Sequence, residues 1–132
     1  MYLAALLLFA RHPLIGAGLT NYQTLMSSVV NWNFGPENAA HNTYLHILSE
    51  NGLLGFLLFF GPVIYLFRRN LRKARQSLPA LLSSAGLAVF LVHGLFDFQL
   101  MTAPQYLLLF AILVGIASKA SSDSASVAPR NS

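Results

Sequence analysis

The sequence contains no cysteine, and only four of its 132 residues are acidic. The absence of cysteine excludes disulfide bonds, iron–sulfur clusters held by cysteine and a cysteine nucleophile. Charged residues make up only 9% of the chain, against about a quarter in soluble domains, whereas 55% of its residues are hydrophobic. A chain of this length has room for one domain at most, and its composition is not that of a soluble one.

Several apolar runs approach the length of about 20 helical residues that crosses the hydrocarbon core of a bilayer. We expect transmembrane spans over three ranges: 52–67, 78–96 and 101–118. The first range is short unless its helix begins near Tyr44, and Gly61-Pro62 predicts a kink inside it. The run over residues 1–10 is too short to span alone, and directly after an initial methionine it is interpreted as the end of a truncated transmembrane helix.

Basic residues are concentrated in the connector 68–77 between the first two spans: Arg68, Arg69, Arg72, Lys73 and Arg75. The positive-inside rule explains this cluster better than binding to nucleic acid, which we exclude, and it places the connector in the cytoplasm. Residues 11–51 then lie outside the cytoplasm, and the tail 119–132 lies inside and is expected to be disordered. The sequence therefore predicts an all-α polytopic membrane protein with about three transmembrane helices, a partial N-terminal one and a helical external segment.

Nearly all histidines and acids fall on the outer side: His12, Glu37, His41, His46, Glu50, His93 and Asp97. Ionisable groups in or beside spans are costly and are usually functional or paired. Residues 35–37, Gly-Pro-Glu, are typical of a helix start, which would put His41 early in a helix, close to free N–H groups. In that position His41 is a candidate for a general base or an anion contact, and equally for a helix-capping role.

His46 and Glu50 are four residues apart, so they share a helix face with Asn42. We interpret them as an ion pair or a hydrogen bond rather than as a metal pair, because the zinc pattern His-Glu-x-x-His and a well-spaced third ligand are missing. His93 and Asp97 also share a face, where they are expected to satisfy each other, and they lie where a structural link to the His41 region is expected. No metal and no cofactor are predicted.

Three other chemistries lack their motifs. No Gly-x-Ser-x-Gly sequence is present for serine catalysis. Glu37 and Glu50 are thirteen residues apart, with nothing that brings them together as a glycosidase pair. The turn-forming segment 11–18 has two glycines but no Gly-Lys-Ser/Thr, which makes a nucleotide-binding phosphate loop a poor reading of it.

Two elements of this sequence match a known family. His41-Asn42, followed after nine residues by Gly52-x-x-Gly55, resembles the signature of the O-antigen ligase/polymerase family of bacterial inner-membrane glycosyltransferases. Residues 12–18, His-Pro-Leu-Ile-Gly-Ala-Gly, resemble that family's HPLxGxG element, which opens its large periplasmic loop. Residues 93–97 are similar to a segment found in many members, and the resemblance covers about residues 9–118.

The resemblance implies transfer of a glycan from an undecaprenyl-diphosphate carrier to a periplasmic acceptor, either lipid A-core, a growing polysaccharide or a protein hydroxyl. It implies neither a nucleotide sugar nor an obligatory metal. His41 would be the functional histidine, polarising the acceptor hydroxyl or contacting the departing diphosphate, and Arg11 would hold that diphosphate. The other residues assigned on this basis are Asn42 and His46 in substrate binding, with Glu50, Gly52, Gly55, His93 and Asp97 in support.

Members of the family have many more spans than this chain, and an arginine that they carry before the periplasmic loop has no counterpart here. The chain is therefore expected to be the C-terminal part of such an enzyme, inactive alone and dependent on a chain that supplies the missing helices. Two alternatives remain open: a non-catalytic membrane scaffold or accessory protein, in which His41 only caps a helix, and a transporter fragment that uses His93 and Asp97. Val89 and Ala85, inward from His93, are apolar and weigh against a conducting path.

Overall fold

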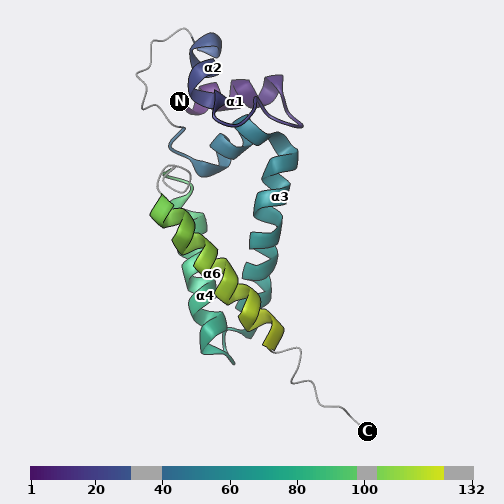
Figure 1. Cartoon of the computed structure of the whole chain (residues 1–132), viewed down its shortest axis with the longest axis vertical. Coiled ribbons are helices and arrows are strands. Elements are labelled where there is room, and N and C mark those ends of the chain that lie inside the picture. The colour runs from purple at the N-terminus through teal and green to yellow at the C-terminus, as the bar shows by residue number, and fades with distance from the viewer. Residues whose placement is uncertain (31–39, 98–103, 124–132) are drawn as a thin grey trace.

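The structure is a computed structural model that describes residues 1–30, 40–97 and 104–123. Its secondary structure within these ranges is helical, which confirms the predicted all-α class. Figure 1 shows the helices, which are α1 (Tyr2–Arg11), α2 (Asn21–Val29), α3 (Thr43–Lys73), α4 (Leu78–His93) and α6 (Pro104–Asp123). The helix α6 continues through residues 119–123, where the tail was expected to begin, and residues 124–132 lie outside the described part.

The lower part of the molecule is a bundle of α4, α6 and most of α3, which run side by side (Figure 1). Its core is built from Val63, Leu87, Phe110 and Ala117. The ring of Phe110 stacks on Phe59 at 5.7 Å between centroids and meets Phe90 at 4.6 Å, so one aromatic side chain of α6 contacts both neighbouring helices.

The outer surface of this bundle is apolar. Leucines and an isoleucine on all three helices are at least half exposed: Leu57, Leu58, Leu82, Leu108 and Ile112. A large exposed apolar surface marks a contact with lipid or with another protein. Among the described helices α3 alone is long and apolar enough to cross a membrane, while α1, α4 and residues 104–119 of α6 are apolar but shorter.

The basic connector is largely helical. The helix α3 continues to Lys73, and α4 begins at Leu78, capped by the Ser77 hydroxyl, which accepts a hydrogen bond from the Ala80 N–H at 3.4 Å. The turn therefore comprises residues 74–77, shorter than the expected loop over 68–77, because most of the basic residues extend the last turns of α3. Favourable interaction of cations with the C-terminal end of a helix dipole contributes to this extension.

A buried amide joins the three helices near this end. The Asn70 side chain is fully buried, and its Nδ2 donates to Ser83 Oγ at 3.3 Å and to the Ala117 carbonyl at 2.9 Å. These contacts link α3 to both α4 and α6. A buried amide is stabilising only when it is hydrogen-bonded, so Asn70 favours one arrangement of the three helices.

The upper part of the molecule is formed by α1, α2 and the first third of α3 (Figure 1). Its small core contains Ala4, Ala5 and Leu8 of α1 with Tyr22 and Met26 of α2. The helix α3 changes direction at Gly52, whose φ of 64° and ψ of −169° are not helical. We call residues 43–51 the arm and residues 53–73 the leg of α3. Pro62, at the position where a kink was expected, lies inside the leg, and Gly52 is the residue of α3 with non-helical backbone angles.

The break in α3 is filled by the segment 13–18, which we call the docking loop. In a continuous helix the N–H groups of residues 53 and 54 would donate to the carbonyls of residues 49 and 50. Four backbone hydrogen bonds with the docking loop replace them: Ala17 N to Ser49 O at 2.8 Å, Gly18 N to Glu50 O at 2.9 Å, Leu53 N to Pro13 O at 2.8 Å and Leu54 N to Leu14 O at 3.1 Å. The two sequence elements that are far apart in the chain therefore form one unit.

Glycines allow this close approach. A Cβ on Gly16 would lie 2.3 Å from the carbonyl group of Glu50, and a Cβ on Gly52 would lie 2.4 Å from that of Leu14. Gly52 also has a positive φ, which side chains disfavour. A Cβ on Gly55 would lie 2.3 Å from Cβ of Asn51, one turn earlier. The Gly52-x-x-Gly55 spacing thus follows from the geometry of the break.

We predict that Gly52→Ala lowers the free energy of unfolding by at least about 2 kcal/mol, because it adds a positive-φ strain to a clash with the loop backbone. Thermal unfolding of the chain in detergent micelles, followed by circular dichroism, measures this loss. Gly115→Ala in α6 is the matched control, since its Cβ would meet nothing within 4 Å. The control should be neutral or up to about 1 kcal/mol more stable, and equal melting of both variants would contradict the role of the break.

Candidate functional site

His41 lies just before α3 rather than inside a helix. The helix begins at Thr43, and Asn42 is its N-cap, with Oδ1 accepting from the Leu45 N–H at 2.9 Å. The expectation that His41 sits early in a helix is therefore wrong, because α3 begins only after its N-cap Asn42, one residue beyond His41. The helix start expected at residues 35–37 lies outside the described residues.

The segment around His41 is fixed to the end of α4. Asn42 Nδ2 donates to the Leu95 carbonyl at 2.9 Å, and the N–H of Thr43 donates to the Gly94 carbonyl at 2.8 Å. The Thr43 hydroxyl donates to the Asp97 carbonyl at 2.8 Å. The expected link between the His41 region and residues 93–97 is thus confirmed.

The three hydrogen bonds of this link are accepted by backbone carbonyls, those of Gly94, Leu95 and Asp97. The helix α4 ends at His93, so Asp97 lies in the turn beyond it and not on the same helix face. The N–H of Asp97 donates to the His93 carbonyl at 3.1 Å. The two residues therefore do not share a helical face as expected, because Gly94 caps the helix first.

His41 itself has an exposed side chain and an unusual backbone. Its φ of 46° falls in the left-handed region, which is uncommon for residues other than glycine, although histidine is enriched there. Its carbonyl accepts a hydrogen bond from the Tyr2 hydroxyl at 3.3 Å. Backbone strain of this kind is found preferentially at functional sites and is maintained by the surrounding contacts. The contacts of Tyr2 and Asn42 supply that support here.

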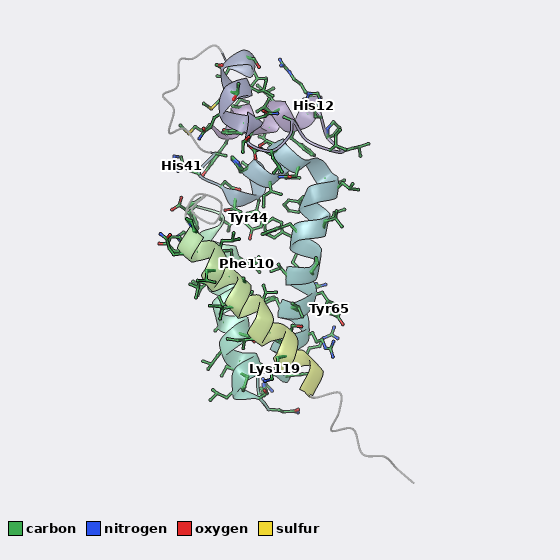
Figure 2. The ribbon with its side chains drawn as sticks, viewed as in Figure 1. His12, His41, Tyr44, Tyr65, Phe110 and Lys119 are labelled. Carbon is green, nitrogen blue, oxygen red and sulfur yellow. The ribbon has the colours of Figure 1, made fainter. Side chains whose placement is uncertain are left out.

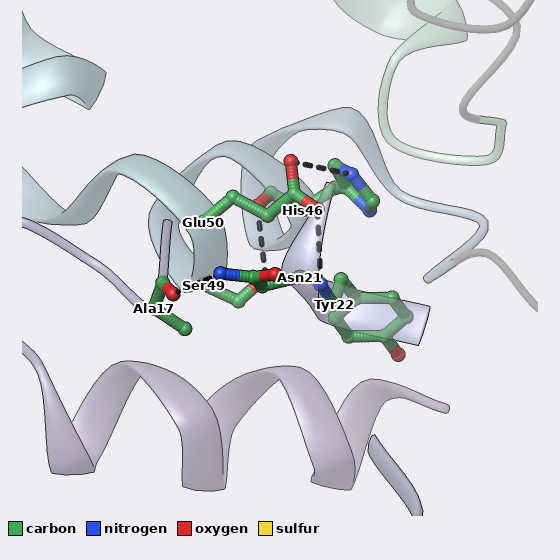
Figure 3. A network of polar contacts seen from close by, with 6 residues as sticks. All are labelled: Ala17, Asn21, Tyr22, His46, Ser49 and Glu50. Carbon is green, nitrogen blue, oxygen red and sulfur yellow. Dashed lines mark hydrogen bonds and ion pairs between the residues drawn. The ribbon is translucent and has the colours of Figure 1, made fainter. Parts of the chain in front are cut away.

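On the arm, His46 and Glu50 form the interaction that their spacing predicted. His46 Nε2 lies 3.3 Å from Glu50 Oε2, and both side chains are buried. Tyr22 of α2 lies against this pair, with its ring 5.1 Å from the His46 ring and its N–H donating to Glu50 Oε1 at 3.0 Å. Figure 3 shows the group, in which Glu50 bridges the arm and α2.

Glu50 acts as the cap of α2 from another part of the chain. The N-cap residue of α2, Thr20, makes no capping bond with its own side chain. Burial raises the pKa of the Glu50 carboxyl. Hydrogen bonds from His46 and from the N–H groups of Tyr22 and Thr20 lower the pKa by more than burial raises it, so the pKa lies below its ordinary value of 4.5. The carboxylate is thus ionised at the positive end of the α2 dipole.

Tyr22 serves the structure. Burial raises the pKa of its phenol to about 12, and its hydroxyl donates to the Met1 carbonyl at 2.9 Å. A phenol that stays neutral is not a base at physiological pH. No sequence motif indicates this role. Residues 16–21, with two glycines before Thr20-Asn21, are typical of a helix start, but they do not reveal that the cap of this helix, Glu50, lies about thirty residues later.

A cavity of about 440 Å³ lies between the start of α2 and the arm. Its polar lining comes from both elements, with Thr20 and Gln23 from one side and His46, Glu50 and Asn51 from the other. Phe59 of the leg adds an apolar wall. The volume falls in the usual range for small-ligand pockets, about 300–1,000 Å³, and the lining is mostly apolar with a few polar groups.

The remaining candidates are more scattered. Arg11 is the last residue of α1 and is exposed. Over residues 1–30, 40–97 and 104–123 no hydrogen bond or ion pair joins Arg11 to His41. Gly52 and Gly55 act through the break in α3, and the same described ranges contain no group of three or more histidine, aspartate or glutamate side chains placed to hold a metal.

We predict that Glu50→Gln lowers the free energy of unfolding by about 1–3 kcal/mol at neutral pH, because hydrogen bonds to a charged group are lost. Since folding lowers the pKa of Glu50, its contribution is complete above about pH 5 and disappears as the pH falls through the folded-state pKa. Thermal unfolding from pH 7 to pH 3 should therefore show wild type and Glu50→Gln converging in acid. A constant difference between them at all pH values would contradict the assignment.

A comparison with known proteins covers both sequence motifs, residues 12–18 and 41–55. A family model described as O-antigen ligase matches residues 1–60, which include the docking loop, His41, the arm and the break at Gly52. No curated protein and no solved structure matches the chain. Over residues 1–60, the match confirms the resemblance to the O-antigen ligase family that the two motifs indicated.

Proposed function

We propose that this chain takes part in moving a glycan from an undecaprenyl-diphosphate carrier to an acceptor on the periplasmic face of a bacterial inner membrane. The acceptor would be lipid A-core, a growing polysaccharide or a protein hydroxyl. The match of residues 1–60 to O-antigen ligase supports a membrane glycan ligase or polymerase. The structure adds that the two motifs of this match form one unit through the docking loop.

The positions of the histidines and of the basic residues along the molecule support the proposed orientation in the membrane. Figure 2 shows His12 and His41 at one end and Lys119 at the other. The basic residues lie at the C-terminal end of α3, and the arm lies at the opposite end of this helix. Because positively charged residues favour the cytoplasmic side, the end that carries His41 would face the periplasm.

His41 carries the proposal. Its side chain is exposed, whereas its backbone has a positive φ and accepts a hydrogen bond from the Tyr2 hydroxyl. In the proposed reaction an acceptor hydroxyl attacks the anomeric carbon of the glycan, and the bond from that carbon to the diphosphate oxygen breaks. The imidazole takes the hydroxyl proton, and the diphosphate leaves with its carrier. General base catalysis of this kind contributes about 10²–10⁴-fold to a rate.

The other site residues have different roles in this proposal. The exposed guanidinium of Arg11 would bind the diphosphate, for which a planar fork of N–H donors is well suited. Asn42 uses both ends of its amide in the cap and in the bond to Leu95, so its role is to position His41. His46 would line the cavity beside Glu50, where part of the glycan would bind.

We predict that His41→Ala reduces glycan transfer by about 100-fold or more, while the amount and the melting temperature of the protein stay unchanged. Transfer of a lipid-linked glycan is measured in membranes that contain the chain together with the additional helices that the activity requires. His12→Ala is the control, since His12 is also an exposed histidine at the same end of the molecule.

Normal glycan transfer by the His41→Ala variant would contradict the assignment of His41 as a general base. If His41→Ala instead melts at a lower temperature and transfer falls only in proportion to the folded protein, His41 has the structural role of the scaffold alternative. Loss of transfer in both histidine variants to the same degree would also contradict a specific role for His41.

A further inference from the structure

A second hollow lies at the opposite end of the molecule, on the outer side of α3. It has a volume of about 570 Å³ and is lined by a single stripe of the helix: Gly61, Ile64, Tyr65, Arg68, Arg69 and Arg72. These residues recur at intervals of three and four, which places them on one helix face. The stripe is apolar toward the middle of the leg and has three guanidinium groups at its cytoplasmic end. We call it the arginine groove.

The apolar part of the groove is not covered by the other described helices. The face that holds Val63 and Asn70 is buried against α4 and α6, whereas Ile64 is 43% and Tyr65 60% exposed. A Cβ on Gly61 would meet nothing within 4 Å, so the apolar end of the groove is open. The hollow beside Gly61 and Ile64 is therefore open to an apolar chain from outside.

The groove carries positive charge, and two of its three arginines, Arg68 and Arg72, are exposed. No acidic residue lines it, and within the described parts of the chain no ion pair joins Arg68 or Arg72 to a carboxylate. Arg69 Nη1 donates to the Tyr65 hydroxyl at 3.2 Å, which orients that guanidinium along the stripe. Three cations that converge on one space favour an anion with several oxygens.

We propose that the arginine groove binds an anionic phospholipid of the cytoplasmic leaflet. The phosphate would contact Arg68, Arg69 and Arg72, and one acyl chain would lie along Ile64 and the notch at Gly61. The positive-inside rule explains why arginines lie on this side, but not why they border an apolar notch on the lipid-facing side of α3. Basic pockets at the cytoplasmic ends of transmembrane helices are known to hold acidic headgroups.

The test compares the purified full chain in neutral detergent with increasing amounts of phosphatidylglycerol or phosphatidylcholine. Native mass spectrometry counts the bound lipids, and thermal unfolding measures their effect. We expect phosphatidylglycerol to bind and stabilise, and phosphatidylcholine to bind at least several times more weakly. Arg68→Gln and Arg72→Gln should each weaken phosphatidylglycerol binding about fivefold, as the loss of one cation near an anionic headgroup implies.

Arg75→Gln is the matched control, because it removes an exposed arginine of the same basic region from outside the groove. It should change binding less than twofold. Gly61→Leu fills the notch without changing charge and should weaken binding several times, while the fold accepts it because the notch is open. Inorganic phosphate at the same concentrations should neither bind nor compete.

Equal effects of Arg68→Gln and Arg75→Gln would overturn the proposal, since they would mean diffuse attraction to the whole basic region. No preference for phosphatidylglycerol, or competition by inorganic phosphate alone, would overturn it as well. Unchanged binding in Gly61→Leu would show that the acyl chain does not occupy the notch. None of these results depends on glycan transfer, so the test of His41 stands separately.

Discussion

The exchange of backbone hydrogen bonds at Gly52 controls the upper half of this molecule. A break inside an apolar helix leaves carbonyls and N–H groups without their helical partners, and each such group is costly away from water. The docking loop supplies two donors and two acceptors at that position, so the cost of the break is offset by the loop itself. The loop and the break therefore form together.

The direction of the arm follows from this exchange. With the arm turned away from the leg, Glu50 reaches the first N–H groups of α2, and Asn42 and Thr43 reach the carbonyls that end α4. His41 then lies at a junction of α1, α3 and α4 and not within any of them. The position of the proposed functional histidine is thus a consequence of backbone geometry eleven residues further along the chain.

The sequence predicted those features of the structure that depend on residues close together in the chain. Long apolar runs gave the helices of the bundle, and the four-residue spacing of His46 and Glu50 gave their contact. A kink was expected at Gly61-Pro62, where the local signal is strongest, whereas no local signal indicated the non-helical angles of Gly52, whose partner Leu14 is 38 residues away. The capping of α2 by Glu50 and the position of His41 before the cap depend on tertiary contacts of the same kind. The roles of His41 and Arg11 in transfer rest on the family resemblance and stay predictions.

Asn70 has a consequence at the far end of the leg. Its single amide nitrogen serves acceptors on two helices, so turning α3 about its own axis by one residue, about 100°, would strand the amide in an apolar environment. The amide thereby fixes the rotation of α3 about its own axis within the bundle. Because the leg is helical from residue 53 to Lys73, this rotational setting is carried over roughly 27 Å, eighteen residues at about 1.5 Å each, to Gly52, where the arm begins. The Asn70 amide, near the end of the leg that carries the basic residues, therefore determines the direction in which the arm leaves the bundle.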